Sequence, residues 1–549
     1  MQSKITIMRY RTKHNWLIIL ILITAFGGFL RFYGLDWGLP WRYHIDENAF
    51  INAANYMRKA PHLNHLNPKW FYHPSLNIYI VCFLSWIYSL FGSLTLPKVH
   101  LLGRINSAFW GTISIPMLFL LGRRLYGALT GILAALLFSV VVIHIQMSHF
   151  FTPDVTLVFF LTATMYFSAQ VVRGGAMKNY IAAGLAAGIG MASKYWAPSI
   201  VPLIVAHIIR LVDLKKSSWR ENRKLIAAFI FAGAVFFVLS PYVILDAGFA
   251  VPKILWWAKK TTGAIPQIWS YHFEGTRPYL YHLSRNLPWA LGWPLALVSG
   301  AGFIFCLIRH RREDILLFSW IILNFLLIGS WYIKSIRYLL PILPFLCLCA
   351  AEPVSRLLSN SKTRILGVSL TLVIFLWSAT FSLAFIHIYS VPHSKTQASE
   401  WLYTNIPAGC GIATDYSIPL GKRNALPDLY SVSSLNFGYL FESQLTPEEK
   451  EAYLTEKIEN ADYIIVADEL REYFRNPAPR HMAEKKFLGD LFSGHLNFEL
   501  IKTFKIYPQL GKWKLNDDGA ELSFHFFDHP AIFVFKRKVQ SAPNTGSIN

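Results

Sequence analysis

Two groups of acidic residues could carry out chemistry beside a membrane. Asp46 and Glu47 follow shortly after the first apolar span, which ends near Arg31. Asp154 ends the segment His149–Asp154, which lies between two further apolar spans. Carboxylates beside a bilayer are costly to place, so they usually mark functional sites. The spacing therefore predicts a membrane enzyme with an acidic site at one face of the bilayer.

The composition defines the class of protein that holds these residues. The chain has 549 residues, of which 54% are hydrophobic and 15% are charged, below the ~25% of soluble proteins. Its formal net charge is +21. Because Lys and Arg cluster in short links between apolar runs, we attribute this charge to the positive-inside pattern and exclude a nucleic-acid partner. The chain is predicted to be a mostly α polytopic membrane protein.

Twelve apolar runs could cross the bilayer. They lie near 16–31, 75–92, 99–121, 126–146, 154–172, 179–193, 195–211, 225–245, 287–308, 314–332, 337–352 and 364–390. If all twelve crossed, several basic links would lie on the wrong side of the membrane, and removing one early crossing repairs them all.

The run 75–92 is the best candidate for removal, because it is short and follows His73-Pro74 in a polar segment. We predict that it forms an interfacial or re-entrant helix, which leaves about eleven transmembrane helices. The N-terminus is then cytoplasmic and the C-terminus is extracytoplasmic. The alternative is that 75–92 crosses and the polarity inverts later.

In this topology the unusual charges converge on one face. Residues 32–98 form a large outer loop that contains Asp46 and Glu47. Asp154 lies in the next outer loop, and Lys194 lies in a tight outer turn. Lys334 and Arg337 lie at a further outer turn.

The chain divides into two predicted domains. Residues 1–390 form the transmembrane domain, and residues 391–549 form an extracytoplasmic α/β domain with a disordered tail at 539–549. Within the second domain, 397–407 is predicted as an amphipathic helix, and 461–467 and 530–537 as buried strands.

The order of short motifs resembles the GT-C superfamily of polytopic glycosyltransferases. The nearest branch contains the protein O-mannosyltransferases, the aminoarabinose–lipid A transferases and the Rgt-type enzymes. The matching pieces are Asp46-Glu47, His73-Pro74-Ser75-Leu76, Arg104, Leu121–Gly127, Ser148–Asp154, Gly184–Gly188, Lys194-Tyr195, Arg337–Pro344 and the helix at 397–407. The resemblance covers about 1–352 well and the C-terminal domain loosely. Ser75 departs from the family pattern, which often has a second Pro there.

The resemblance implies an inverting glycosyltransferase of the plasma membrane, in bacteria the inner membrane. The donor would be a polyprenyl-phosphate-linked sugar, and the acceptor a hydroxyl of protein, lipid A or glycan. Asp46 is predicted to take the proton of the attacking hydroxyl. Burial and the adjacent carboxylate should raise its pKa. Glu47 either shares the catalysis or holds the loop through Arg31 or Arg104.

The leaving phosphate gains negative charge, which nearby cations would stabilise. The predicted donor-binding residues are Lys194, Tyr195, Arg337, Tyr338, Arg104, Lys334 and His73. Asp154 is predicted to orient the acceptor or the Asp46 loop. No cofactor is expected. A divalent cation is the alternative, with the ligand set His44, Asp46, Glu47, His149 and Asp154.

Each assignment has a structural alternative. Asp46 and Glu47 could form a solvated turn, and Asp154 could cap the following helix. Lys194, Lys334 and Arg337 could be interfacial anchors, and the histidines could be packed at the interface.

Two other functions stay open. A secondary transporter would use the acidic residues as a proton relay, but the chain lacks visible inverted repeats and midplane charges. A catalytically inactive, glycan-binding membrane protein would keep sugar binding without turnover.

Overall fold

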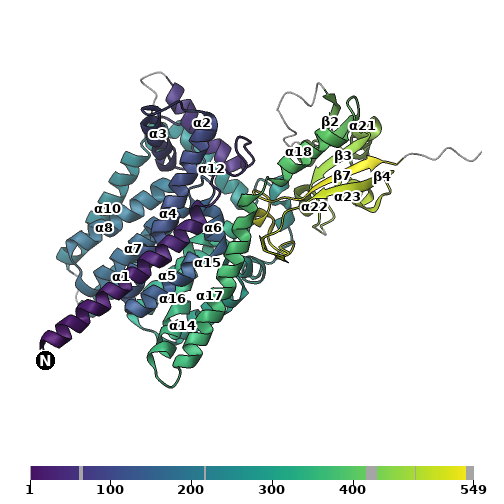
Figure 1. Ribbon diagram of the computed structural model, residues 1–549. Helices are drawn as coiled ribbons and strands as arrows, with labels where there is room; N and C mark the ends of the chain where they lie inside the picture. Colours follow the sequence, from purple (N-terminus) through teal and green to yellow (C-terminus); the bar gives the residue numbers. More distant parts are fainter. Residues whose placement is uncertain (1, 61–65, 216–217, 416–428, 477, 539–549) are drawn as a thin grey trace, which may run out of the picture. The chain divides into compact units, whose positions relative to one another are not determined.

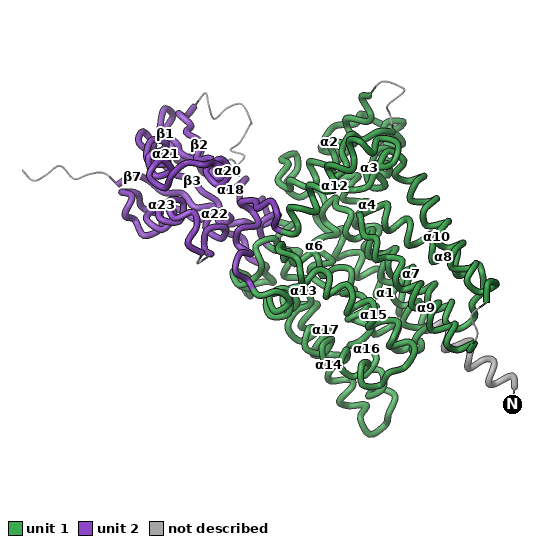
Figure 2. The backbone as a smooth tube through the Cα atoms, turned by 180° about the vertical axis from the view of Figure 1, so that it is seen from behind, with its two compact units in different colours: residues 1–262, 277–390, 508–524 green, residues 263–276, 391–507, 525–549 purple. Residues whose placement is uncertain are grey.

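The computed structural model describes residues 2–60, 66–215, 218–415, 429–476 and 478–538. The chain forms two compact units (Figures 1 and 2). Unit 1 comprises residues 1–262, 277–390 and 508–524, and unit 2 comprises residues 263–276, 391–507 and 525–549. The predicted tail at 539–549 lies outside the described residues.

Unit 1 is a bundle of helices. Its α-helices are α1 (Gln2–Phe32), α2 (Ile45–Lys59), α3 (Leu76–Ser89), α4 (Leu96–Leu125), α5 (Ala128–Ser139), α6 (Val142–Ser148), α7 (Asp154–Gly174), α8 (Met177–Ser193), α9 (Val201–Leu214), α10 (Trp219–Leu239), α11 (Tyr242–Leu245), α12 (Ala247–Thr261), α13 (Leu287–Leu291), α14 (Trp293–Arg309), α15 (Arg312–Gly329), α16 (Leu343–Ser359) and α17 (Arg364–Ile386). The short 3₁₀ segments are η2 (Ala197–Ile200), η5 (Ile336–Ile342), η6 (His387–Ser390) and η7 (Leu522–Phe524), and η4 (His282–Asn286) is a π-helix. A small hairpin, β5 (Gln509–Leu510) and β6 (Trp513–Lys514), completes the unit.

Several helices of unit 1 are long and apolar enough to span a bilayer. Among the described residues there are six, or up to eight if each of two bent pairs forms one span. One bent pair is α5 with α6, at 63°, and the other joins His282–Leu291 to α14 at 117°. The chain is thus an integral membrane protein, whereas the count of about eleven spans stays a prediction.

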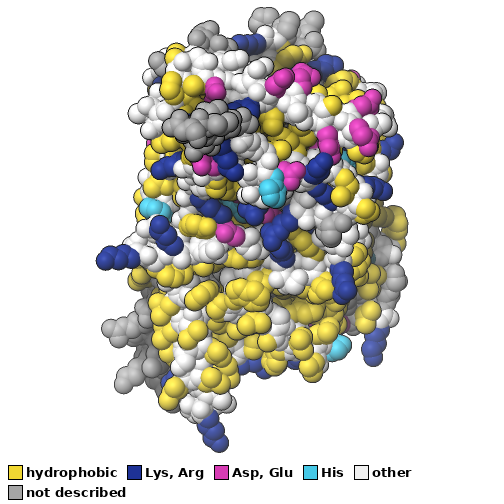
Figure 3. Space-filling model, turned by 90° about the vertical axis from the view of Figure 1, so that its right-hand side faces the viewer, with side chains coloured by type: hydrophobic (Ala, Val, Ile, Leu, Met, Phe, Trp, Pro, Cys, Tyr) yellow, Lys and Arg dark blue, Asp and Glu magenta, His cyan; other side chains and the backbone are white. Residues whose placement is uncertain are grey.

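The exposed surface of unit 1 fits a lipid environment. Figure 3 shows a broad region of hydrophobic side chains on the face that it displays. Ile308 on α14 and Ile365 on α17 are 76% and 83% exposed. Apolar side chains exposed over such a large area mark contact with a partner or a membrane.

Helix α3 is too short to cross a bilayer. Its 14 residues span about 21 Å, compared with about 30 Å for the hydrocarbon core. This length favours the predicted interfacial or re-entrant position of 75–92.

The Gly184–Gly188 motif allows close packing of α8 against α10 (Figure 1). A Cβ atom at Gly184 would lie 2.3 Å from the carbonyl oxygen of Ala228, and one at Gly188 would lie 2.4 Å from that of Ala232. Small residues at such contacts let helix backbones approach each other in membranes. The motif therefore serves packing.

We expect Gly184→Ala to destabilise unit 1, although alanine is the better helix former by about 1 kcal/mol. The new methyl group must push the α10 backbone away. Gly233→Ala in α10 is the matched control, since no atom lies within 4 Å of its Cβ position. Thermal unfolding in detergent should give a lower Tm for Gly184→Ala only. An equal Tm for both variants would contradict this packing role.

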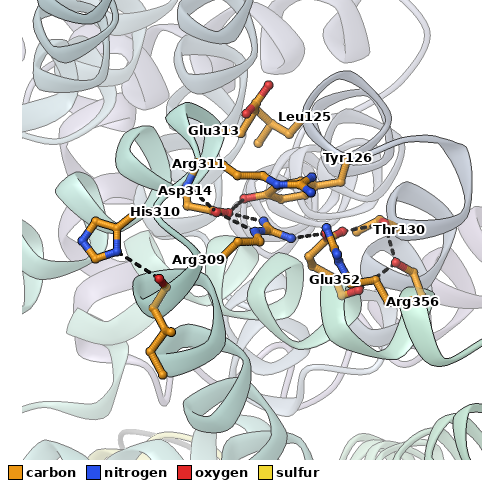
Figure 4. A network of polar contacts seen from close by, with 12 residues as sticks. Leu125, Tyr126, Thr130, Arg309, His310, Arg311, Glu313, Asp314, Glu352 and Arg356 are labelled. Atoms are coloured by element: carbon orange, nitrogen blue, oxygen red, sulfur yellow. Dashed lines mark hydrogen bonds and ion pairs between the residues drawn. The ribbon is translucent and has the colours of Figure 1, made fainter.

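A network of ion pairs and hydrogen bonds joins the turn after α4 and the start of α5 to α14, α15 and α16 (Figure 4). The guanidinium of Arg309 pairs with both Asp314 and Glu352. The hydroxyl of Tyr126 donates to Asp314 at 2.7 Å, and that of Thr130 donates to Glu352 at 3.1 Å. The network fastens the turns that follow α4 and α14.

Unit 2 is the predicted α/β domain. Its sheet has the order β2 (Ser431–Ser434), β1 (Gly411–Thr414), β3 (Tyr463–Ala467), β7 (Ile532–Arg537) and β4 (Phe498–Phe504). Strands β2, β1 and β3 are parallel, and β7 runs antiparallel to β3 and β4. Its helices are η3 (Ile268–Phe273), α18 (Ser394–Asn405), α20 (Phe437–Glu442), α21 (Pro447–Glu459), α22 (Asp468–Tyr473) and α23 (Met482–Ser493).

The helix and the two strands predicted in this domain correspond to α18, β3 and β7. The assignment of all of 391–549 to one domain differs from the structure in one segment, because residues 508–524 pack in unit 1. There the Glu521 carboxylate accepts from the backbone amide of Ile336 at 3.1 Å, and Ser523 lies 2.9 Å from Ser335. Residues 263–276 instead join unit 2.

Candidate functional site

Glu47 and Arg104 form a buried ion pair inside unit 1. Glu47, in the first turn of α2, is 1% exposed, and Arg104 on α4 is 3% exposed. Arg104 donates through Nε and Nη2 to the two carboxylate oxygens, both at 2.9 Å. Its Nη1 donates to the carbonyl oxygens of Leu35 and Trp37, and the amide of Phe151 donates to Glu47 at 2.8 Å. Glu47 thus holds the outer loop through Arg104, which is one of the two partners that the sequence analysis left open.

Arg31 takes no part in this pair. Its guanidinium donates to the carbonyl oxygens of Gly27 and Ser139, at 2.8 and 2.9 Å, and lies 3.0 Å from Nδ1 of His144. The loop is therefore held through Arg104 and not through Arg31.

Asp46 points to a different set of residues. Its carboxylate accepts from Nη1 of Arg337, on η5, at 2.6 Å. Beside this pair, Nζ of Lys194 donates to Asp154, the first residue of α7, at 2.7 Å. Asp154 therefore forms an ion pair with Lys194, which the helix-capping alternative did not include.

His73 completes this group from the loop before α3. Its ring stacks on Phe50 with 5.4 Å between centroids and lies 5.7 Å from Trp70 and 6.3 Å from Trp257. Burial, and next the charge of Lys194, lower the pKa of His73 to about 3, so the ring is neutral at pH 7.

We name Asp46, His73, Asp154, Lys194 and Arg337 the Asp46 cluster. Its two carboxylates and two cations balance in charge, and His73 adds none at pH 7. The Asp46 side chain is 35% exposed and that of Arg337 is 18% exposed. The cluster is thus an ion-pair arrangement that solvent or a ligand can reach from the Asp46 side.

The expected rise in the pKa of Asp46 is wrong for this structure. Burial does raise it, but the charge of Arg337, the charge of His44 and the hydrogen bond from Arg337 lower it, to about 2 overall. The neighbouring carboxylate of Glu47 faces Arg104, so its negative charge is compensated there.

Three other predicted donor-binding residues, Tyr338, Tyr195 and Lys334, differ in whether they contact the Asp46 cluster. Tyr338 lies at the cluster, with its ring centroid 5.6 Å from Nζ of Lys194. The hydroxyl of Tyr195 is buried and has no hydrogen-bond partner within the described parts of the chain. Lys334 donates to the carbonyl oxygen of Tyr332 at 3.1 Å, and its own carbonyl accepts from Asn286. The structure therefore joins Tyr338 to the cluster but shows no such contact for Tyr195 or Lys334.

Sequence reasoning missed the aromatic surroundings of the cluster. Trp331 packs edge-to-face on Tyr338, with 5.3 Å between centroids, and on Trp196 at 5.6 Å. The rings around His73 come from α2, α12 and the preceding loop. The sequence signals only that aromatic residues are abundant near the interface, which does not say which of them meet.

The alternative metal ligands are not arranged as a metal site. His44 accepts from the backbone amide of Glu47 at 3.3 Å as a helix cap. The two ring nitrogens of His149 each lie 2.9 Å from a carbonyl oxygen, and the ring stacks on Tyr389. Within the described residues, no group of three or more His, Cys, Asp or Glu side chains is arranged to hold a metal ion. The residues present do not fit the divalent-cation alternative.

Comparisons with known proteins agree with this fold. Residues 81–244 match the family model described as dolichyl-phosphate-mannose-protein mannosyltransferase. No curated protein matches the chain. Among the solved structures that are similar over most of the chain are two that each have 13% identity to it.

The first is the oligosaccharyltransferase AglB from Archaeoglobus fulgidus, solved with an inhibitory peptide and a dolichol-phosphate. The match has a TM-score of 0.52 and covers 92% of this chain and 75% of that one. The second is ArnT from Cupriavidus metallidurans in the apo state, with a TM-score of 0.51 and coverage of 95% and 98%. The predicted GT-C fold is confirmed, since the chain shares its fold with AglB and ArnT.

Proposed function

We propose that this protein is an inverting glycosyltransferase that moves a sugar from a polyprenyl-phosphate donor to a hydroxyl acceptor. The observation that carries the proposal is the Asp46 cluster, in which a solvent-accessible carboxylate lies beside two cations. A transferase of this kind needs a base for the acceptor and positive charge for the leaving phosphate. The GT-C fold supports a glycosyl transferase as the general class of activity.

Lys194 and Arg337 are the residues that would bind the donor phosphate. Arg337 offers a planar guanidinium that suits bidentate contact with phosphate oxygens, and Lys194 adds a compact charge. AglB, which shares the fold, has been solved with a dolichol-phosphate, in support of a lipid phosphate as ligand. Asp154 holds Lys194 in place through their 2.7 Å contact.

Asp46 would accept the proton of the acceptor hydroxyl as the oxygen attacks the anomeric carbon. The phosphate leaves from the opposite side of that carbon. One direct displacement of this kind inverts the anomeric configuration, and no covalent bond to the protein forms. The acceptor hydroxyl would belong to a protein, lipid A or a glycan.

We place the N-terminus in the cytoplasm and unit 2 outside, in a plasma membrane, in bacteria the inner membrane. In support, the basic turn that contains Arg309 lies near the end of α4 that is distant from Arg104. The cluster and this basic turn thus lie toward opposite ends of α4, which agrees with the positive-inside rule.

The proposal is tested by sugar transfer from a panel of polyprenyl-phosphate sugars, using the purified full chain in lipid with membrane extract as the acceptor source. We expect transfer from one donor, at the same rate in excess chelator as without it. For the variant Asp46→Asn, the control for the loss of one negative charge is Asp36→Asn, because Asp36 is an exposed residue in the same outer loop. Substrate-dependent proton flux without transfer would favour the transporter, and binding without transfer from any donor would favour the glycan-binding protein.

A further inference from the structure

Both cations of the Asp46 cluster are already paired with carboxylates. Arg337 binds Asp46, and Lys194 binds Asp154. An anion that enters the cluster must therefore share at least one cation with a carboxylate. Two anions that share one cation weaken each other's binding, because each adds repulsion and takes part of the attraction.

The pair that yields more easily is the one between Asp46 and Arg337. The Asp46 side chain is 35% exposed, whereas that of Asp154 is 4% exposed. Removing the cation from a buried carboxylate costs more than removing it from a carboxylate that water can reach. Arg337 also has a buried Nε that finds no hydrogen-bond partner within the described residues, so its guanidinium keeps a donor for a ligand.

We propose that a lipid phosphate binds in antagonism to Asp46, by drawing Arg337 away from it and so releasing Asp46 to act as the base. This inference rests on the proposed function for the identity of the ligand. Coupling between two sites is reciprocal. If the ion pair of Asp46 lowers the affinity for the phosphate by a given factor, bound phosphate destabilises that ion pair by the same factor.

The groups that face Asp46 from the surrounding elements support this exchange. His44 precedes it on the same turn, His73 faces it from the loop before α3, and Arg337 and Tyr338 face it from η5. Burial lowers the pKa of both histidines, that of His73 to about 3, so the His73 ring carries no charge at pH 7. Once Arg337 turns to the phosphate, the neutral ring of His73 does not replace its charge, and the released carboxylate becomes a stronger base.

This arrangement ties the base to the presence of the donor. In the structure Asp46 has a pKa of about 2 and is a weak base. Only a site that holds the phosphate would present a carboxylate able to accept the proton of a hydroxyl group. The donor would therefore have to bind before the acceptor is activated.

The test measures binding rather than turnover. Undecaprenyl phosphate is titrated into the full chain in nanodiscs of neutral lipid, for wild type, Asp46→Asn and the control Asp36→Asn. We expect Asp46→Asn to bind about 5- to 150-fold more tightly than wild type, the usual range of coupling between sites. Asp36→Asn should bind like wild type.

A double-mutant cycle separates the role of Arg337 from a general charge effect. In an Arg337→Gln background, Asp46→Asn should change the affinity by less than about twofold, because the shared cation is gone. Equal or weaker binding by Asp46→Asn in the wild-type background, or the same gain in both backgrounds, would overturn the inference. So would a failure of every variant to bind the lipid.

The two proposals fail in different ways. Tighter binding by Asp46→Asn together with no sugar transfer by wild type would sink the transferase and leave the antagonism intact. Sugar transfer by wild type with unchanged binding by Asp46→Asn would sink the antagonism alone.

Discussion

Asp46→Asn is expected to lower the kcat of sugar transfer by about 10²- to 10⁴-fold, the usual contribution of a general base. The amide keeps the size of the side chain, but it cannot accept the proton of the acceptor hydroxyl. The measurement is the initial rate of transfer by purified variants, at saturating donor and acceptor.

The control for this prediction is folding. Asp46 is partly exposed and Glu47 still holds the loop, so the Tm of Asp46→Asn should stay near that of wild type. A variant that folds normally and transfers sugar at the wild-type rate would remove Asp46 as the base. The search would then move to Asp154.

Glu47→Gln is expected to destabilise the protein by about 3–5 kcal/mol, the cost of removing one partner from a buried ion pair. The change leaves the charged guanidinium of Arg104 buried beside a neutral amide, with one amide oxygen and two backbone carbonyls as its remaining acceptors. The measurement is the Tm or the free energy of unfolding in detergent. A second variant, Glu47→Met with Arg104→Met, should recover part of the loss because it removes both charges.

The ion pair between Glu47 and Arg104 also predicts how the stability of the protein depends on pH. Burial raises the pKa of Glu47, but the charge and hydrogen bonds of Arg104 outweigh it and lower the pKa from 4.5 to about 2. A carboxyl group with a lowered pKa stabilises the fold above its unfolded pKa, and this contribution is lost as the pH falls toward its folded pKa. Wild type should thus lose about 3 kcal/mol between pH 5 and pH 2 that Glu47→Gln does not lose. Parallel acid-unfolding curves for the two proteins would contradict this account.

The sequence predicted that the unusual charges share one face of the membrane, but not which of them meet or how they pair. The topology that puts all basic links on one side of the membrane places Asp46, Asp154, Lys194 and Arg337 at the opposite face, and the structure brings these four residues together. Adjacent residues on a helix point about 100° apart. Asp46 and Glu47 therefore face different partners, and only tertiary packing decides which of them faces the buried Arg104.

Some features of the fold have no local signal. The 63° bend between α5 and α6 falls in a continuous apolar run at Val140 and Val141, without Pro or Gly. Residues 508–524 belong to unit 1 through contacts such as Glu521 with Ile336, which join residues far apart in the chain. The strand β3 could be predicted because a short apolar run between polar segments is a local signal.

The most direct test of the proposed mechanism is the anomeric configuration of the transferred sugar. A polyprenyl-phosphate sugar of known configuration is converted by the wild-type protein, and the glycosidic bond of the product is assigned by NMR. Direct displacement with Asp46 as the base predicts an inverted bond. A retained configuration cannot arise from one direct displacement on the face opposite the leaving phosphate and would contradict the mechanism proposed for the Asp46 cluster.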